Sequence, residues 1–137
     1  MTTREEVLKY CLSFPDTYQD APFHDENWQL VRYRKNKKVF AWTYFRDDKL
    51  CVNVKVNPEW RDLWRQTYAA VLPGYHQNKE HWNTIILDGT IPVEEVKRMI
   101  AESYDLFHRN RAIQNNGIPM LLILMISRKH GRVSLSP

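Results

Sequence analysis

The sequence predicts an α+β fold in which helices cover one face of an antiparallel β-sheet. Three strand-like segments follow one another between Trp28 and Val56, separated by short turns, as in an antiparallel meander. One helical pattern precedes them, and two more begin near Asn57 and Pro92, with a further short strand between those two. This order of elements is typical of a layer of helices on one side of a sheet.

The N-terminal segment is predicted to form an amphipathic helix. Thr2 and Thr3 are each followed three residues later by glutamate, which is the capping-box pattern. Apolar side chains at positions 7, 8, 11 and 12 then form one helical stripe, and the helix is expected to end near Pro15. The acidic passage from Asp16 to Glu26 is predicted to consist of turns.

Three β-strands are predicted at residues 28–34, 39–45 and 50–56. The first two are rich in β-branched and aromatic residues, and the third alternates between apolar residues and Cys51, Asn53 and Lys55. Such alternation indicates that one face of the sheet covers a core. The hairpin turns between these strands are expected at residues 35–38 and 46–49.

A second helix, a short strand and a third helix are predicted after the meander. Asn57 is a favourable N-cap, and Pro58 and Glu59 suit the first turn of a helix. Residues 84–87 indicate a short buried strand. Pro92 then opens a long helix with an apolar stripe on one side and charged residues on the other.

The net charge of +4 is a property of the C-terminal end. All 16 acidic residues lie at or before Asp105, whereas residues 106–137 contain five basic residues and no acidic one. A nucleic-acid function must therefore depend on local clusters of positive charge. We divide the chain into an α+β domain at residues 1–109 and a basic, partly apolar extension at residues 110–137. The apolar run 120–126 could be an edge strand, an interface segment or part of an ill-ordered appendage, and we favour an appendage with an apolar docking segment.

Length and composition limit the classes of protein to which this chain can belong. A length of 137 residues suffices for one domain whose core needs neither disulfides nor a metal. Two cysteines do not make a disulfide framework, and the first residues lack the apolar segment of a signal peptide, which favours a cytoplasmic location. No apolar run approaches the roughly 20 residues that a membrane-spanning helix needs. We expect no cofactor and no membrane association, while the oligomeric state stays open.

The segment from Leu72 to Asn83, which we call the signature loop, concentrates aromatic, imidazole and amide side chains. Pro73 and Gly74 predict a type II turn, in which the glycine takes a positive φ. The other side chains either pack the loop against the domain or face a partner, because a loop so rich in Tyr, Trp and His is not typical of a flexible linker.

Several short motifs carry a resemblance that covers about residues 1–108. They are Pro22-Phe23, Lys38-Val39-Phe40-Ala41, Asn57-Pro58-Glu59, Pro73-Gly74-Tyr75-His76, Asn78-Lys79 and His81-Trp82-Asn83. With these motifs the chain resembles the MmcQ/YjbR family of small bacterial proteins. The resemblance implies a CyaY-like fold and a DNA-binding protein with a double-wing arrangement of hairpins. The sequence departs from the family pattern at His24, where glycine is common, and at Gln77, where methionine is common.

A cluster of positive charge marks the first predicted hairpin turn. Five basic residues occur within seven positions, with no acidic residue among them: Arg32, Arg34, Lys35, Lys37 and Lys38. A projecting hairpin of this kind suits phosphate contacts along a DNA duplex, with Arg46 and Lys49 at the second turn as further candidates. The alternative is a solvated turn whose lysines prevent edge-to-edge pairing of strands.

The signature loop matches no metal or catalytic motif. His76 and His81 are five residues apart, which fits neither one helix face nor the His-Glu-x-x-His zinc pattern. No nucleophile elbow, P-loop or Rossmann glycine pattern occurs, so we predict no metal site and no enzyme activity. A candidate anion site instead comprises aromatic, basic and amide side chains of the loop, namely Tyr75, His76, Lys79, His81, Trp82 and Asn83.

The sequence thus predicts a non-catalytic DNA-binding protein whose basic hairpin contacts phosphates. The alternative is a module that binds a protein or an anionic ligand through the segment from Tyr75 to Asn83. A third, structural hypothesis is that this segment only locks the second helix onto the sheet.

Overall fold

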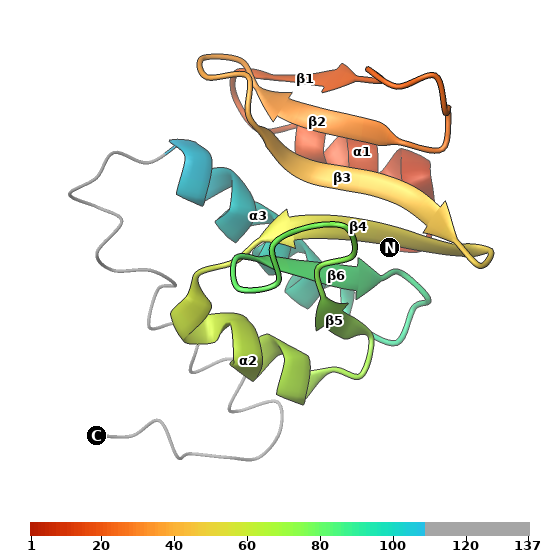
Figure 1. Cartoon of the computed structure of the whole chain (residues 1–137), viewed down its shortest axis with the longest axis vertical. Coiled ribbons are helices and arrows are strands. Elements are labelled where there is room, and N and C mark those ends of the chain that lie inside the picture. The colour runs from red at the N-terminus through yellow and green to blue at the C-terminus, as the bar shows by residue number, and fades with distance from the viewer. Residues whose placement is uncertain (109–137) are drawn as a thin grey trace.

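The computed structural model describes residues 1–108, which form three helices and six strands (Figure 1). In chain order the elements are α1 (Arg4–Leu12), β1 (Thr17–Asp20), β2 (Gln29–Tyr33), β3 (Val39–Arg46), β4 (Lys49–Lys55), α2 (Pro58–Thr67), β5 (Val71–Pro73), β6 (Trp82–Ile86) and α3 (Val93–His108). The predicted extension at residues 110–137 lies outside the described residues.

The strands form one antiparallel sheet in the order β1-β2-β3-β4-β6-β5. In Figure 1, α1 and α3 lie behind the sheet, and α2 lies beside β5 at the lower edge. Val7 of α1, Trp64 of α2 and Ile100 of α3 all belong to one core cluster with the strands. The predicted α+β class, with an antiparallel sheet and helices on one face, is confirmed.

A β-bulge decides which side chains of β3 enter this core. The register between β2 and β3 shifts by one residue next to Arg32. Phe40 and Ala41 are therefore both fully buried in the core, although they are neighbours along the strand. Beyond the bulge, regular alternation turns Trp42 and Tyr44 to the opposite face of the sheet, which no described helix covers.

The predicted helix caps form as expected. The Thr3 hydroxyl accepts a hydrogen bond from the Glu6 amide, and the Glu6 carboxylate accepts one from the Thr3 amide, which completes the capping box of α1. The Asn57 side chain accepts from the Glu59 amide at 2.9 Å, with Pro58 in the first position of α2.

Two short strands depart from the sequence prediction. β1 forms in the passage that was predicted to consist of turns, and β5 forms at the start of the signature loop. Both lie at the edges of the sheet and pair with one neighbour each, so they lack the apolar alternation of a central strand.

Candidate functional site

An aromatic cluster covers the helix-free face of the sheet. Trp28 stacks on Tyr44 with ring centroids 4.4 Å apart, and Tyr44 stacks on Tyr75 at 5.7 Å. Trp42 meets Trp28 in a T-shaped geometry at 6.3 Å, and Phe23 lies nearly parallel to Trp42 at 6.5 Å. We call these five residues the face cluster. They bring together β3, the segment between β1 and β2, and the signature loop.

Apart from Tyr75, the residues of the face cluster were not among the candidates predicted from the sequence. Trp42 and Tyr44 are two residues apart in a predicted strand and must therefore share a face, which is the signal that was available. The bulge at Phe40, which turns these rings away from the core, has no sequence signature of its own.

A buried polar network fixes the signature loop to this face. The Asn53 side chain is fully buried, and its Oδ1 accepts hydrogen bonds from the hydroxyls of Tyr44 and Thr84, each at 2.6 Å. Asn53 Nδ2 donates to the Tyr75 carbonyl at 2.7 Å, and the Tyr75 amide donates to Thr84 Oγ1 at 2.9 Å. Both backbone groups of Tyr75 are thus held by side chains of β4 and β6.

Burial raises the pKa of the Tyr44 hydroxyl to about 12. The phenol therefore keeps its proton at neutral pH and remains a hydrogen-bond donor to Asn53. The Arg46 guanidinium lies 3.9 Å from the centroid of the Tyr75 ring, which is a close cation–π contact. Aromatic rings and one cation therefore adjoin one another across the helix-free face.

A pocket of about 470 Å³ opens beside the face cluster. Its lining residues are Phe23, Asp25, Trp28, Trp42, His76 and Gln77. Its volume lies in the range of small-molecule sites. The Trp42 indole N–H is buried and has no hydrogen-bond partner among the described residues. Such a donor costs free energy until a partner satisfies it.

The predicted type II turn at Pro73 and Gly74 is wrong. Among the described glycines, the positive φ belongs to Gly89, at 86°. A glycine is required at position 74 because this part of the loop passes very close to Trp82. The Gly74 amide donates to the Trp82 carbonyl at 3.0 Å, and an added Cβ would lie 2.7 Å from the Trp82 Cβ. The left-handed residue of the loop is His76, with a φ of 60°.

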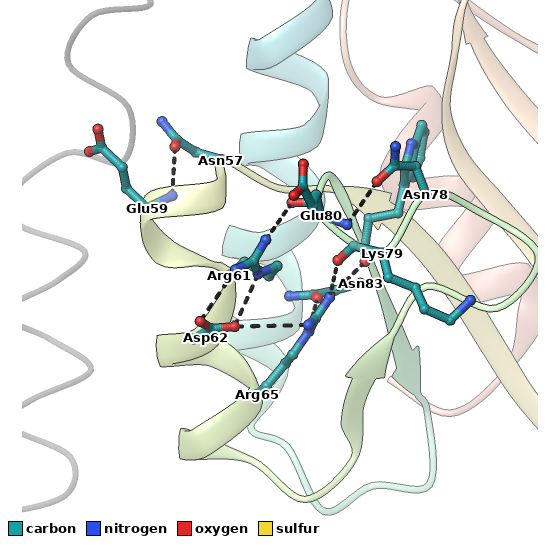
Figure 2. A network of polar contacts seen from close by, with 10 residues as sticks. Asn57, Glu59, Arg61, Asp62, Arg65, Asn78, Lys79, Glu80 and Asn83 are labelled. Atoms are coloured by element: carbon teal, nitrogen blue, oxygen red, sulfur yellow. Dashed lines mark hydrogen bonds and ion pairs between the residues drawn. The ribbon is translucent and has the colours of Figure 1, made fainter.

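Two arginines of α2 hold the second half of the signature loop (Figure 2). Arg65 donates to Asn83 Oδ1 at 2.7 Å and to two carbonyls of the loop at 2.5 and 3.2 Å. Arg61 donates to the Glu80 carbonyl at 3.2 Å and pairs with Asp62 at 3.0 Å. This half of the loop locks α2 to the sheet, which supports the structural hypothesis for these residues.

The six candidate anion-site residues do not meet at one place. Tyr75 and His76 lie together on the helix-free face, with ring centroids 3.9 Å apart. The Trp82 ring lies 6.2 Å from a phenylalanine of α3, and Asn83 is buried under α2. The signature loop therefore divides into a half that faces the pocket and a half that packs.

Of the remaining two candidates, Lys79 is exposed and His81 is half-buried. His81 Nε2 is 4.0 Å from the Glu80 carboxylate. The amides of residues 75, 77, 80 and 81 all donate to oxygens of the protein. These four amides are therefore not available to an anion, and the exposed Lys79 side chain supplies the positive charge of this half of the loop.

The basic hairpin turn joins β2 to β3 and projects from the sheet (Figure 1). Lys35, Lys37 and Lys38 are exposed, and their ammonium groups form no ion pair with another described residue. These three charges are available to a partner in solution.

The two arginines of the predicted cluster are already engaged. Arg32 Nε pairs with Asp20 of β1 at 2.7 Å, and the same guanidinium donates to the Lys37 carbonyl. The Arg34 guanidinium lies 4.9 Å from the centroid of the Tyr18 ring. Both side chains help to hold β1 against the hairpin.

Lys55 adds a positive charge that the sequence analysis did not include. Its Nζ lies 4.6 Å from the centroid of the Phe107 ring. Burial lowers the pKa of the Lys55 amine, and the positive charge of Lys38 lowers it further. We call Lys35, Lys37, Lys38 and Lys55 the tip cluster.

Arg46 and Lys49 lie at the other end of β3 from the tip cluster. They pair across the β3–β4 turn, and both line a second pocket, of about 230 Å³, together with Thr84. β3 has eight residues, which places the two turns about 23 Å apart along the strand. The seven candidate DNA-binding residues therefore form two separate groups.

Within residues 1–108, no group of three or more His, Cys, Asp or Glu side chains is placed to hold a metal ion. Cys11 and Cys51 are buried free thiols, and burial raises the pKa of the Cys11 thiol to about 12, which makes it a poor nucleophile. None of the described helices combines the length and apolarity that crossing a bilayer requires.

Comparison with known proteins places this fold in a family. The family model YjbR matches residues 12–106, which include the face cluster, the signature loop and the tip cluster. The chain belongs to the YjbR family. The predicted resemblance to MmcQ/YjbR proteins is thereby confirmed.

Two relatives in the YjbR family illustrate its spread. The uncharacterised protein YjbR of Escherichia coli K12 is 31% identical over 102 residues, which cover 74% of this chain and 84% of the relative. The uncharacterised protein YyaQ of Bacillus subtilis 168 is 32% identical over 117 residues, covering 77% of this chain and 98% of the relative.

Solved structures share the fold. Protein DR2400 of Deinococcus radiodurans, described as a DUF419 domain, has a TM-score of 0.73 and 30% identity, and the match covers 85% of this chain and 88% of that one. A Pseudomonas syringae protein has a TM-score of 0.68 and 27% identity, with 76% of this chain and 97% of that chain covered.

Proposed function

We propose that this protein binds double-stranded DNA without catalysing a reaction on it, and that the tip cluster contacts the phosphates. The observation that supports this function is the presence of three exposed lysines on one projecting turn, with Lys55 at the end of β4 adding to their field. None of them forms an ion pair with a described carboxylate. Lysine contacts with phosphates release counterions from the duplex, which gives affinity that falls with salt.

The contacts of the hairpin refine the predicted set of DNA-binding residues. Arg32 is paired with Asp20 and serves the hairpin itself. Lys35, Lys37 and Lys38 are the phosphate ligands in this proposal, and Lys55 adds to the local field.

The test is a titration of a short labelled duplex at several salt concentrations. Replacing Lys35, Lys37 and Lys38 together by alanine is expected to weaken binding and to reduce the slope of log K against log salt by about 0.9 per lost contact. Lys9→Ala, an exposed lysine on α1, is the control and should leave both quantities unchanged. If the triple variant bound the duplex with wild-type affinity and with the wild-type salt dependence, the proposal would be refuted.

The amine of Lys55 offers a second readout. A phosphate bound at the tip cluster favours the charged form of the amine and should raise its lowered pKa toward the ordinary value. Side-chain NMR titration with and without duplex measures this directly. An unchanged Lys55 pKa in the saturated complex would place the DNA elsewhere.

A second candidate function is a module that binds a ligand through the first half of the signature loop. The pocket favours it, because His76 lines the pocket beside the fixed Tyr75. If the protein works in this way, ligand binding requires His76 and does not require the tip cluster. His76→Asn tests this, since asparagine tolerates the positive φ at this position while the imidazole is lost. Ligand binding by this variant at wild-type strength would exclude a role for the imidazole.

A further inference from the structure

The pocket on the helix-free face is walled by aromatic rings. Trp28 and Trp42 meet at 86°, so their rings form a corner. Phe23 lies nearly parallel to Trp42, but its centroid is 6.5 Å away, whereas the fully stacked Trp28 and Tyr44 are 4.4 Å apart. The Phe23 side chain is 49% exposed, which is high for a large apolar residue. This wall is suited to a flat ring that stacks on aromatic faces.

Polar groups occur at the rim of the same pocket. Asp25 contributes a carboxylate, Gln77 an amide and His76 an imidazole to the lining. A heteroaromatic ring with donor and acceptor atoms at its edge can form hydrogen bonds with these three side chains, whereas a purely apolar ligand cannot.

Positive charge lies next to the pocket along the sheet. The Arg46 guanidinium contacts the Tyr75 ring at 3.9 Å, and the Tyr75 ring lies 3.9 Å from that of His76, a pocket residue. Lys49 pairs with Arg46 across the turn, and both line the second, smaller pocket together with Asp47. The aromatic pocket and the positive charges beside it therefore suit a ligand in which a flat ring is joined to an anionic group.

We propose that this face binds a nucleobase, with the ring in the aromatic pocket and the attached phosphate toward Arg46 and Lys49. The inference deepens the second candidate function, because it relies on the fixed Tyr75–His76 wall, and it does not depend on DNA binding by the tip cluster. Base stacking on aromatic side chains tolerates any base, so the ligand is either a free mononucleotide or an unpaired base of a single strand.

The experiment follows the five tryptophan indole N–H signals of the full-length chain by NMR. Adenosine monophosphate, adenosine, inorganic phosphate and a deoxyadenylate hexamer are titrated separately, and Trp42→Phe identifies the signal of Trp42. We expect a saturable shift of that signal with the monophosphate, weaker binding of adenosine, and no comparable shift with phosphate. Binding of the hexamer without the monophosphate would assign the site to single strands.

Matched variants test where the ring binds. Phe23→Ala removes part of the wall and should weaken nucleotide binding about tenfold. Phe45→Ala removes an equally exposed ring (46%) from the opposite face of the sheet and should not change it. Arg46→Met should abolish the preference for the monophosphate over adenosine. The alanine variant of Lys35, Lys37 and Lys38 should bind the nucleotide normally, which separates this site from the proposed duplex contact.

Three results would overturn the inference. The first is the absence of any saturable Trp42 shift at millimolar nucleotide and hexamer. The second is an equal shift with inorganic phosphate alone, which would mean an anion site without a base site. The third is a shift caused only by a proline-rich peptide, which aromatic grooves also bind.

Discussion

Replacing Asn53 by alanine is expected to cost about 3 kcal/mol of unfolding free energy. The side chain makes three hydrogen bonds of 2.6 to 2.7 Å in a fully buried position, and each contributes roughly 1 kcal/mol net. The substitution leaves the Tyr44 hydroxyl without its Asn53 acceptor and the Tyr75 carbonyl without its Asn53 donor. It should therefore also loosen the loop wall of the pocket.

Urea denaturation measures this cost. With a slope of about 1.5 kcal/mol per molar urea, the midpoint of Asn53→Ala should fall by roughly 2 M. Gln19→Ala is the control, because Gln19 bonds to Gln29 at an exposed position and should cost less than about 0.5 kcal/mol. If Asn53→Ala lost no more stability than Gln19→Ala, the polar network would not be what fixes the loop.

Three further predictions follow from the loop contacts and from the buried thiol. Gly74→Ala should cost about 2 kcal/mol in urea denaturation, because the added Cβ meets the Trp82 Cβ at 2.7 Å; an unchanged midpoint would contradict the close approach. Arg65→Met keeps the aliphatic stem but removes the hydrogen bonds to Asn83 and the loop carbonyls, and it should cost about 2 kcal/mol in the same assay. The Cys11 thiol has a pKa of about 12 in the folded state and a value of 9.0 when unperturbed, so the folded chain keeps a proton that the unfolded chain releases. The free energy of unfolding therefore decreases as pH rises above about 9. Between about pH 8 and pH 10, it should fall by about 1.4 kcal/mol more in wild type than in Cys11→Ala, and parallel plots of unfolding free energy against pH for the two proteins would refute this.

Local signals predicted most of the fold. The Thr3 capping box and the Asn57 cap depend on interactions within a few residues, and the structure contains both. The alternation over residues 50–56 correctly placed its four apolar residues in the core, but Cys51 and Asn53 on the other face are buried as well. β1 and β5 escaped prediction because their pairing with distant strands, rather than their own apolar pattern, makes them strands.

The site was less predictable than the fold, because its residues meet only through tertiary contacts. The motif Pro73-Gly74-Tyr75-His76 identified the family, but its turn type was wrong, since Gly74 is required by the nearby Trp82 backbone and not by its own φ. The face cluster depends on a bulge, and the contact of Lys55 with Phe107 depends on the packing of α3 against the sheet. None of these is visible from spacing along the chain.

We propose that the tip cluster, and not the acid-free end of the chain, binds DNA. This proposal is tested by the salt dependence of duplex binding for two full-length variants that each lose three positive charges. One replaces Lys35, Lys37 and Lys38, and the other replaces the basic residues at positions 128, 129 and 132. We predict that the slope of log K against log salt falls by about 2.7 in the first variant and is retained in the second. A retained slope in the first variant with a reduced slope in the second would contradict it.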